Sequence, residues 1–218
     1  MKYANTQSIP TALEELCDPS RMALIVYDMQ VGIRNQIKNG DEITAACVQA
    51  RNAARKAGMR VVFTRHLSNP KPWMGVAQYR TGMAWQHTDD PSRIKPVFLR
   101  DSPAAAIVPE LAPTVDELVI EKLSMSAFEG TPLEFALRDC GILAFAIVGI
   151  ALEIGIEPTV RHAGDLGFIP VVLTDACGYG NREAADRTLA TLRFVGEPVL
   201  TDVAAFSSSL DHSSTPKS

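Results

Sequence analysis

Short apolar runs alternate with helix-forming segments along most of this chain, and this alternation limits its possible folds more than any other feature. The run MALIVYD at 22–28 is almost continuously apolar, as expected for a strand that is covered on both faces. The segment 41–58 that follows is rich in helix formers and ends at Gly58. The same analysis predicts strands at 59–66, 117–122, 142–150, 169–177 and 197–206, and helices at 131–141, 158–167 and 181–196.

Alternating strands and helices predict an α/β fold, because parallel strands are joined by right-handed helical crossovers. We expect three α-β-α layers around a mostly parallel, Rossmann-like sheet of about six strands. One domain is predicted over 1–206, and the polar composition of 207–218 predicts a disordered tail. The segment 67–116 interrupts the rhythm, and a connection of that length is typical of a lid or a substrate wall.

Composition excludes several classes of partner. A net charge of -4, with no dense basic run, gives no reason to expect nucleic acid or an anionic membrane surface. The N-terminal stretch lacks the apolar core of a signal peptide, and the longest apolar run, 142–152, is too short to span a bilayer. Four widely spaced cysteines without a CxxC pair favour free thiols and a cytoplasmic location.

Candidate functional residues stand where strands end, since ligands of such sheets bind beyond the carboxyl ends of the strands. Asp28 closes the first strand, Lys122 closes the strand at 117–122, and the apolar run at 142–150 leads to a turn at Gly155. Gln30, just after Asp28, is a candidate substrate contact. The alternative interpretation makes Asp28 a helix N-cap and Lys122 a solvated lysine.

Other motifs that carry chemistry are absent from the sequence. There is no GxGxxG, no GxxxxGK[ST] and no GxSxG, which disfavours a dinucleotide, a P-loop nucleotide or a serine nucleophile, and we expect no cofactor. The four histidines show no HxH or HExxH spacing, so we expect no metal site. Cys177, at a strand end, is the one thiol with a candidate role.

The segments ALIVYDMQ, VIEKLSMSAFEGTPLEFALRDCGI, IVGIALEIGIEPTVRHAGDLGF and VVLTDACG together resemble the isochorismatase-like (cysteine hydrolase) superfamily, from about residue 20 to 206. The resemblance implies a catalytic Asp28 and Lys122, and it places Gly155 where amidohydrolases of the superfamily carry their cysteine. A glycine has no side chain to attack a carbonyl, so covalent thioester catalysis at this position is excluded.

The resemblance also implies an activity without the cysteine, since isochorismatases of the superfamily lack it and hydrolyse the enol ether of isochorismate. Asp28 would then act as an acid, which requires a raised pKa that the nearby Lys122 opposes, or it would work ionised as a general base on water. The alternatives are an amide or ester hydrolase that uses activated water or a displaced thiol, and a non-catalytic ligand-binding member. The superfamily further implies a homo-oligomer, a dimer or a tetramer.

Substrate contacts follow from the same resemblance. Gln78 and Tyr79 match the region from which isochorismatases supply a glutamine, and Glu153 stands where they often carry histidine. A cis peptide bond is expected between Ile150 and Ala151. Together with backbone amides around Gly155, at the start of a helix, it would hold a carboxylate or an oxyanion.

Overall fold

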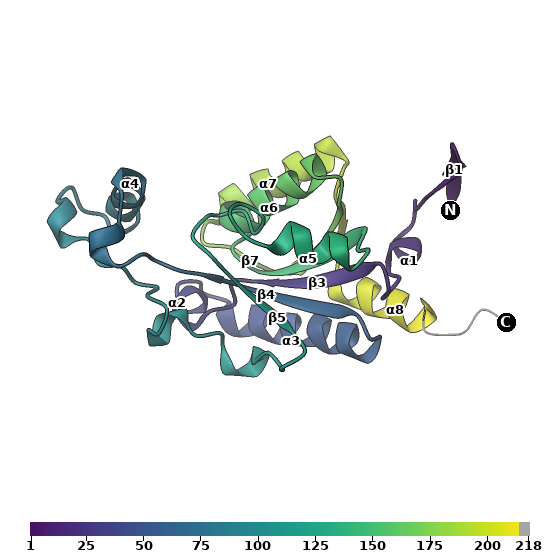
Figure 1. Cartoon of the computed structure of the whole chain (residues 1–218), viewed down its shortest axis with the longest axis horizontal. Helices are drawn as coiled ribbons and strands as arrows, with labels where there is room; N and C mark the ends of the chain where they lie inside the picture. Colours follow the sequence, from purple (N-terminus) through teal and green to yellow (C-terminus); the bar gives the residue numbers. More distant parts are fainter. Residues whose placement is uncertain (214–218) are drawn as a thin grey trace.

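A six-stranded, all-parallel sheet forms the centre of the computed structural model, which describes residues 1–213 (Figure 1). The strand order is β5-β4-β3-β6-β7-β8. The strands are β3 (Met22–Tyr27), β4 (Arg60–His66), β5 (Leu118–Lys122), β6 (Ala144–Ile150), β7 (Ile169–Gly178) and β8 (Val199–Thr201). The predicted α/β class and the six strands are therefore confirmed.

Helices cover both faces of the sheet, which gives the three predicted layers (Figure 1). One face carries α3 (Gly40–Lys56) and α8 (Val203–Ser213). The other carries α5 (Leu133–Asp139), α6 (Glu157–Asp165) and α7 (Arg182–Val195). Alternate residues of β3 pack into the two cores, because successive side chains of a strand point to opposite faces, and all six residues are buried.

Shorter elements complete the described chain. An N-terminal hairpin pairs β1 (Lys2–Ala4) with β2 (Gln7–Ile9), and single turns form α1 (Leu13–Leu16) and α2 (Val31–Arg34). The 3-10 turns are η1 (Lys71–Trp73), η2 (Pro91–Arg93), η3 (Pro103–Ala105) and η4 (Pro109–Leu111). A π-helical turn, η5 (Leu152–Ile156), connects β6 to α6.

The C-terminal end differs from the prediction. The strand predicted over 197–206 stops at Thr201, because the Asp202 carboxylate accepts a hydrogen bond from the Ala205 amide (2.7 Å) and so caps α8. The tail predicted to be disordered from 207 is helical as far as 213, where Ser209 and Leu210 are buried against the domain. Residues 214–218 lie outside the described part of the chain.

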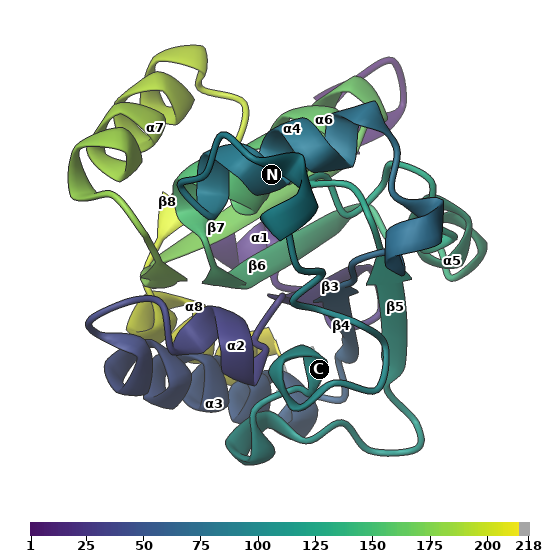
Figure 2. The same cartoon turned by 90° about the vertical axis from the view of Figure 1, so that its left-hand side faces the viewer.

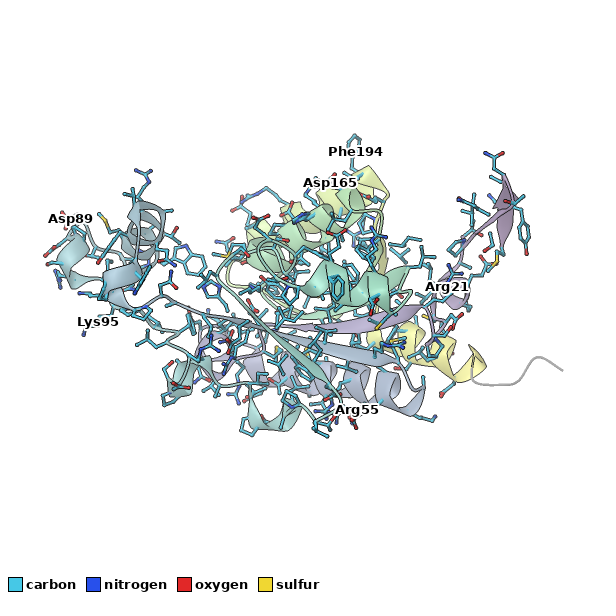
Figure 3. The ribbon with its side chains drawn as sticks, in the orientation of Figure 1. Arg21, Arg55, Asp89, Lys95, Asp165 and Phe194 are labelled. Atoms are coloured by element: carbon cyan, nitrogen blue, oxygen red, sulfur yellow. The ribbon has the colours of Figure 1, made fainter. Side chains whose placement is uncertain are left out.

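The long connection 67–116 contains α4 (Val76–Trp85), which projects from the body (Figure 1). The view turned by 90° places α4 in front of β6 and β7, so it stands beyond the carboxyl ends of the strands (Figure 2). Asp89 and Lys95 mark the far end of this projection (Figure 3). Within residues 1–213, no helix is long and apolar enough to cross a membrane.

Candidate functional site

The carboxylate of Asp28 lies at the centre of a hydrogen-bonded cluster at the carboxyl edge of the sheet. Asp28 follows β3 directly, has a left-handed backbone (φ 45°) and is 4% exposed. Its Oδ1 accepts a hydrogen bond from the Thr64 hydroxyl of β4 (2.6 Å), whose oxygen in turn accepts from the Asp28 amide (3.1 Å). Its Oδ2 accepts from the Lys122 ammonium (2.7 Å). A carboxyl group that only accepts hydrogen bonds fits the ionised form.

Lys122 is the last residue of β5, and its side chain reaches past β4 to Asp28. All three ammonium protons have partners: Asp28 Oδ2, the Tyr27 hydroxyl (2.8 Å) and the Ser124 carbonyl (3.1 Å). The ammonium also lies 4.4 Å from the centroid of the Tyr27 ring. Burial lowers the pKa of Lys122, and the neighbouring Asp28 opposes this shift. The predicted pairing of an acid with a lysine is therefore present in the geometry.

A cavity of about 170 Å³ lies against Asp28. Most of its wall is apolar. The polar lining side chains are Asp28, Tyr27, His66 and Gln36, and the apolar ones include Ile33, Ile37, Trp85, Phe98, Met125 and Ile154. Trp85 comes from α4, so the long connection contributes to the wall as predicted. Trp73, in contrast, is 79% exposed.

His66, at the end of β4, faces the same cavity. Burial lowers its pKa, which leaves a neutral imidazole at pH 7. Its Nδ1 is buried and has no hydrogen-bond partner among the described residues. The Phe98 ring meets it edge-on, with centroids 5.9 Å apart. The sequence analysis considered His66 only as one of four histidines without metal-binding spacing.

The third predicted component, the turn after β6, also lines the cavity through Ile150, Ala151 and Gly155. The peptide bond between Ile150 and Ala151 is cis, as expected. The backbone amides that were expected to hold an anion already have an acceptor within the turn. The amides of Ile154, Gly155 and Ile156 all donate to the Ala151 carbonyl (3.3, 3.0 and 3.1 Å), because the π-turn gathers them on one acceptor. In this structure they are hydrogen-bonded within the turn, and an anion site there stays a prediction.

Four predicted substrate contacts lie away from the cavity wall. Gln30 is fully buried, and its amide group is hydrogen-bonded to the backbone of His66 and Ala105. The Glu153 carboxylate accepts from the amides of Gly180 and Asn181 (both 2.8 Å) and so secures the start of α7.

Gln78 and Tyr79 lie on α4, and the Gln78 carbonyl accepts from the Asn69 side chain (3.3 Å). Neither residue lines the cavity, and their substrate contacts stay a prediction.

The described residues form no metal centre, and the Cys177 thiol lies away from the cavity. Residues 1–213 contain no group of three or more His, Cys, Asp or Glu side chains that could hold a metal ion. Cys177 is buried in β7, where burial raises its pKa well above the ordinary value, and it does not line the cavity. The proposed displaced thiol therefore has neither access nor a thiolate.

The fold defines an α/β protein with a buried acid–lysine pair at the carboxyl edge of its sheet, and sequence comparison supplies the family. The sequence profile of the Isochorismatase domain matches residues 22–203, so this chain belongs to the isochorismatase family of hydrolases. The uncharacterized isochorismatase family protein YecD of Escherichia coli O157:H7 is 31% identical over 172 residues, covering 77% of this chain and 85% of that protein. The ureidoacrylate amidohydrolase RutB of Stutzerimonas stutzeri (strain A1501) is 28% identical over 188 residues, covering 77% and 74%.

Solved structures show the same fold. A cysteine hydrolase from Pseudomonas syringae pv. phaseolicola 1448A superposes with a TM-score of 0.77 at 22% identity, covering 89% of this chain and 94% of that one. An isochorismatase family protein from Burkholderia thailandensis superposes with a TM-score of 0.73 at 25% identity, covering 94% and 100%.

Proposed function

We propose that this chain hydrolyses a small neutral ester or amide with a water molecule activated by Asp28, and without a covalent intermediate. One observation carries the proposal. An Asp28 carboxylate, held by Lys122 and Thr64, faces a cavity whose described lining contains no cysteine, serine or threonine. Gly155, which the family resemblance places at the cysteine position, adds no nucleophile either.

The chemistry requires one proton to move twice. Asp28 takes a proton from water as the water oxygen bonds to the acyl carbon, and the carbonyl electron pair moves onto oxygen. When the tetrahedral intermediate collapses, the bond to the leaving group breaks and Asp28 returns the proton to it. Lys122 stays positively charged and stabilises the Asp28 carboxylate before and after the reaction.

Charge and polarity of the cavity support a neutral substrate. The ionisable side chains in its described lining are Asp28, the neutral His66 and the Tyr27 phenol. The three protons of the nearby Lys122 ammonium already have hydrogen-bond partners. An anion would meet the Asp28 carboxylate without an unpaired cation to balance it. Isoleucine, tryptophan and phenylalanine side chains suit an apolar or aromatic body. The relationship to a ureidoacrylate amidohydrolase supports an amide as the reacting group.

A second candidate substrate is an enol ether such as isochorismate. The glycine at 155 favours it, because isochorismatases also work without the cysteine. That mechanism needs a protonated Asp28, whereas both carboxylate oxygens here accept hydrogen bonds, from Thr64 and Lys122.

A substrate panel with one matched variant tests the proposal. The probes are p-nitrophenyl acetate, acetanilide and isochorismate, with nitrophenol, aniline and pyruvate as the measured products, and Asp28→Asn keeps the size of the side chain. We expect hydrolysis of at least one neutral probe, reduced by about 10²–10⁴-fold in Asp28→Asn. Pyruvate release alone would support the enol-ether reaction instead. Saturable binding without turnover would support the non-catalytic alternative.

A further inference from the structure

Tyr27, one residue before Asp28, occupies the space into which a side chain at position 155 would project. A Cβ built on Gly155 would lie 2.6 Å from Cε1 of the Tyr27 ring and closer still to its hydroxyl. Tyr27 is 1% exposed and packs in the core beneath α5 and α6, so its ring has little freedom to withdraw. A side chain at position 155 would therefore collide with the Tyr27 phenol, and glycine avoids this collision.

The hydroxyl of Tyr27 is connected to both members of the acid–lysine pair. It accepts a hydrogen bond from Lys122 (2.8 Å), which also binds Asp28, and it donates to the Met125 carbonyl. Tyr27, Asp28 and Gly155 all line the same cavity. Three functional groups thus meet at one point: a carboxylate, an ammonium and a phenol.

The phenol stays protonated, so it is a hydrogen-bond donor and not a nucleophile. Burial and the neighbouring Asp28 carboxylate raise the pKa of Tyr27 well above its ordinary value. The ammonium hydrogen bond from Lys122 polarises the phenol, which strengthens the bond that its own proton can donate.

A hydrolytic site needs a donor for the oxygen on which charge develops. The backbone amides of residues 154–156, which the sequence suggested for this role, already donate to the Ala151 carbonyl. The Tyr27 hydroxyl lies beside Gly155, and both residues line the cavity. A phenol proton can rotate about the C–O bond, so it is not fixed on the Met125 carbonyl.

We propose that Tyr27 takes the place of the side chain at 155 as a catalytic residue, and that its neutral phenol donates a hydrogen bond to the substrate oxygen. The chemical role inferred for Tyr27 rests on the proposed function. The position of its ring against Gly155 does not. When water attacks, the carbonyl oxygen becomes negative and the phenol binds it without giving up its proton. The proton balance therefore remains with Asp28.

Turnover of p-nitrophenyl acetate tests the chemistry with Tyr27→Phe, which removes only the hydroxyl and keeps the ring. We expect kcat to fall by about 10²-fold with KM nearly unchanged, as for the loss of one oxyanion donor. If Asp28→Asn abolishes turnover and Tyr27→Phe does not reduce it, the inference about Tyr27 is wrong and the proposed function stands. If Asp28→Asn turns over as fast as the native chain, the proposed function itself fails.

Thiol reactivity tests the placement and needs no substrate. In a Cys140→Ser background, which removes the exposed native thiol, Gly155→Cys is compared with Tyr27→Val/Gly155→Cys. We expect the single variant to lose roughly 2–12 °C of Tm through overpacking and to react slowly with iodoacetamide. The double variant has room for the thiol, and the Lys122 ammonium lowers its pKa, so it reacts at least ten-fold faster at pH 7. Equal rates would show that Tyr27 does not fill this space, and they would overturn the inference even if no probe ester is hydrolysed.

Discussion

Removing the charge of Lys122 has a cost that can be worked from the structure. Its side chain is fully buried and that of Asp28 is 5% exposed, with 2.7 Å between Nζ and Oδ2. Lys122→Met keeps the apolar stem but leaves the Asp28 carboxylate buried without its cation. Breaking a buried pair by removing one partner costs about 3–5 kcal/mol. For a chain of this size, that corresponds to a fall in Tm of about 6–20 °C.

A double-mutant cycle separates this interaction from general damage to the core. Unfolding in urea is followed for the native chain, Asp28→Asn, Lys122→Met and the double variant, with equal m-values as the check on two-state behaviour. The double variant has no unpaired buried charge, so its cost should fall below the sum of the single costs by more than about 1 kcal/mol. A single cost below about 1 kcal/mol, or additive costs, would refute the description of Asp28 and Lys122 as a coupled buried pair.

Three further predictions concern residues around the pair. Iodoacetamide should label one thiol per native chain, Cys140, and leave hydrolysis unchanged, as mass spectrometry and rates would show; loss of activity on labelling would contradict a cysteine-free mechanism. Burial lowers the pKa of His66 in the folded chain below 6.5, so the unfolded chain binds the proton more readily. The contribution of neutral His66 to stability should therefore be lost as pH falls from 6.5 through the folded pKa. Urea titrations of His66→Gln should lack that loss, and an unchanged slope would assign it elsewhere. Glu153→Ala should cost about 1–2 kcal/mol by releasing two amides at the start of α7, while Glu153→Gln keeps an acceptor; equal costs would argue against this hydrogen-bonding role.

Much of the fold could be predicted because strand patterning is local. The run 22–28 gives β3 because every residue is buried between two helical layers, and Gly58 lies just past the end of α3 with a positive φ. The segment 197–206 was predicted less well, because its apolar residues are compatible with a strand and with a helix. The Asp202 cap decides in favour of a helix.

Candidate site residues could be predicted where they stand at the end of a strand. They could not be predicted where their position depends on packing between distant segments. Asp28 and Lys122 could be identified because their strands end there. Tyr27 was embedded in an apolar run and its contact with Gly155 spans 128 positions of sequence, although a lone phenol in such a run is a signal that could have pointed to it. The sequence could not show that the Gln30 side chain is hydrogen-bonded to the backbone of His66 and Ala105, because those partners lie 36 and 75 positions away.

The central claim is that Asp28, and not a thiol, carries the chemistry. The most direct test is one rate measurement, the initial hydrolysis of p-nitrophenyl acetate by the alkylated native chain and by Asp28→Asn. The account predicts that the alkylated native chain keeps its full rate and that Asp28→Asn loses about 10²-fold or more. Loss of the rate on alkylation, with Asp28→Asn still active, would contradict it.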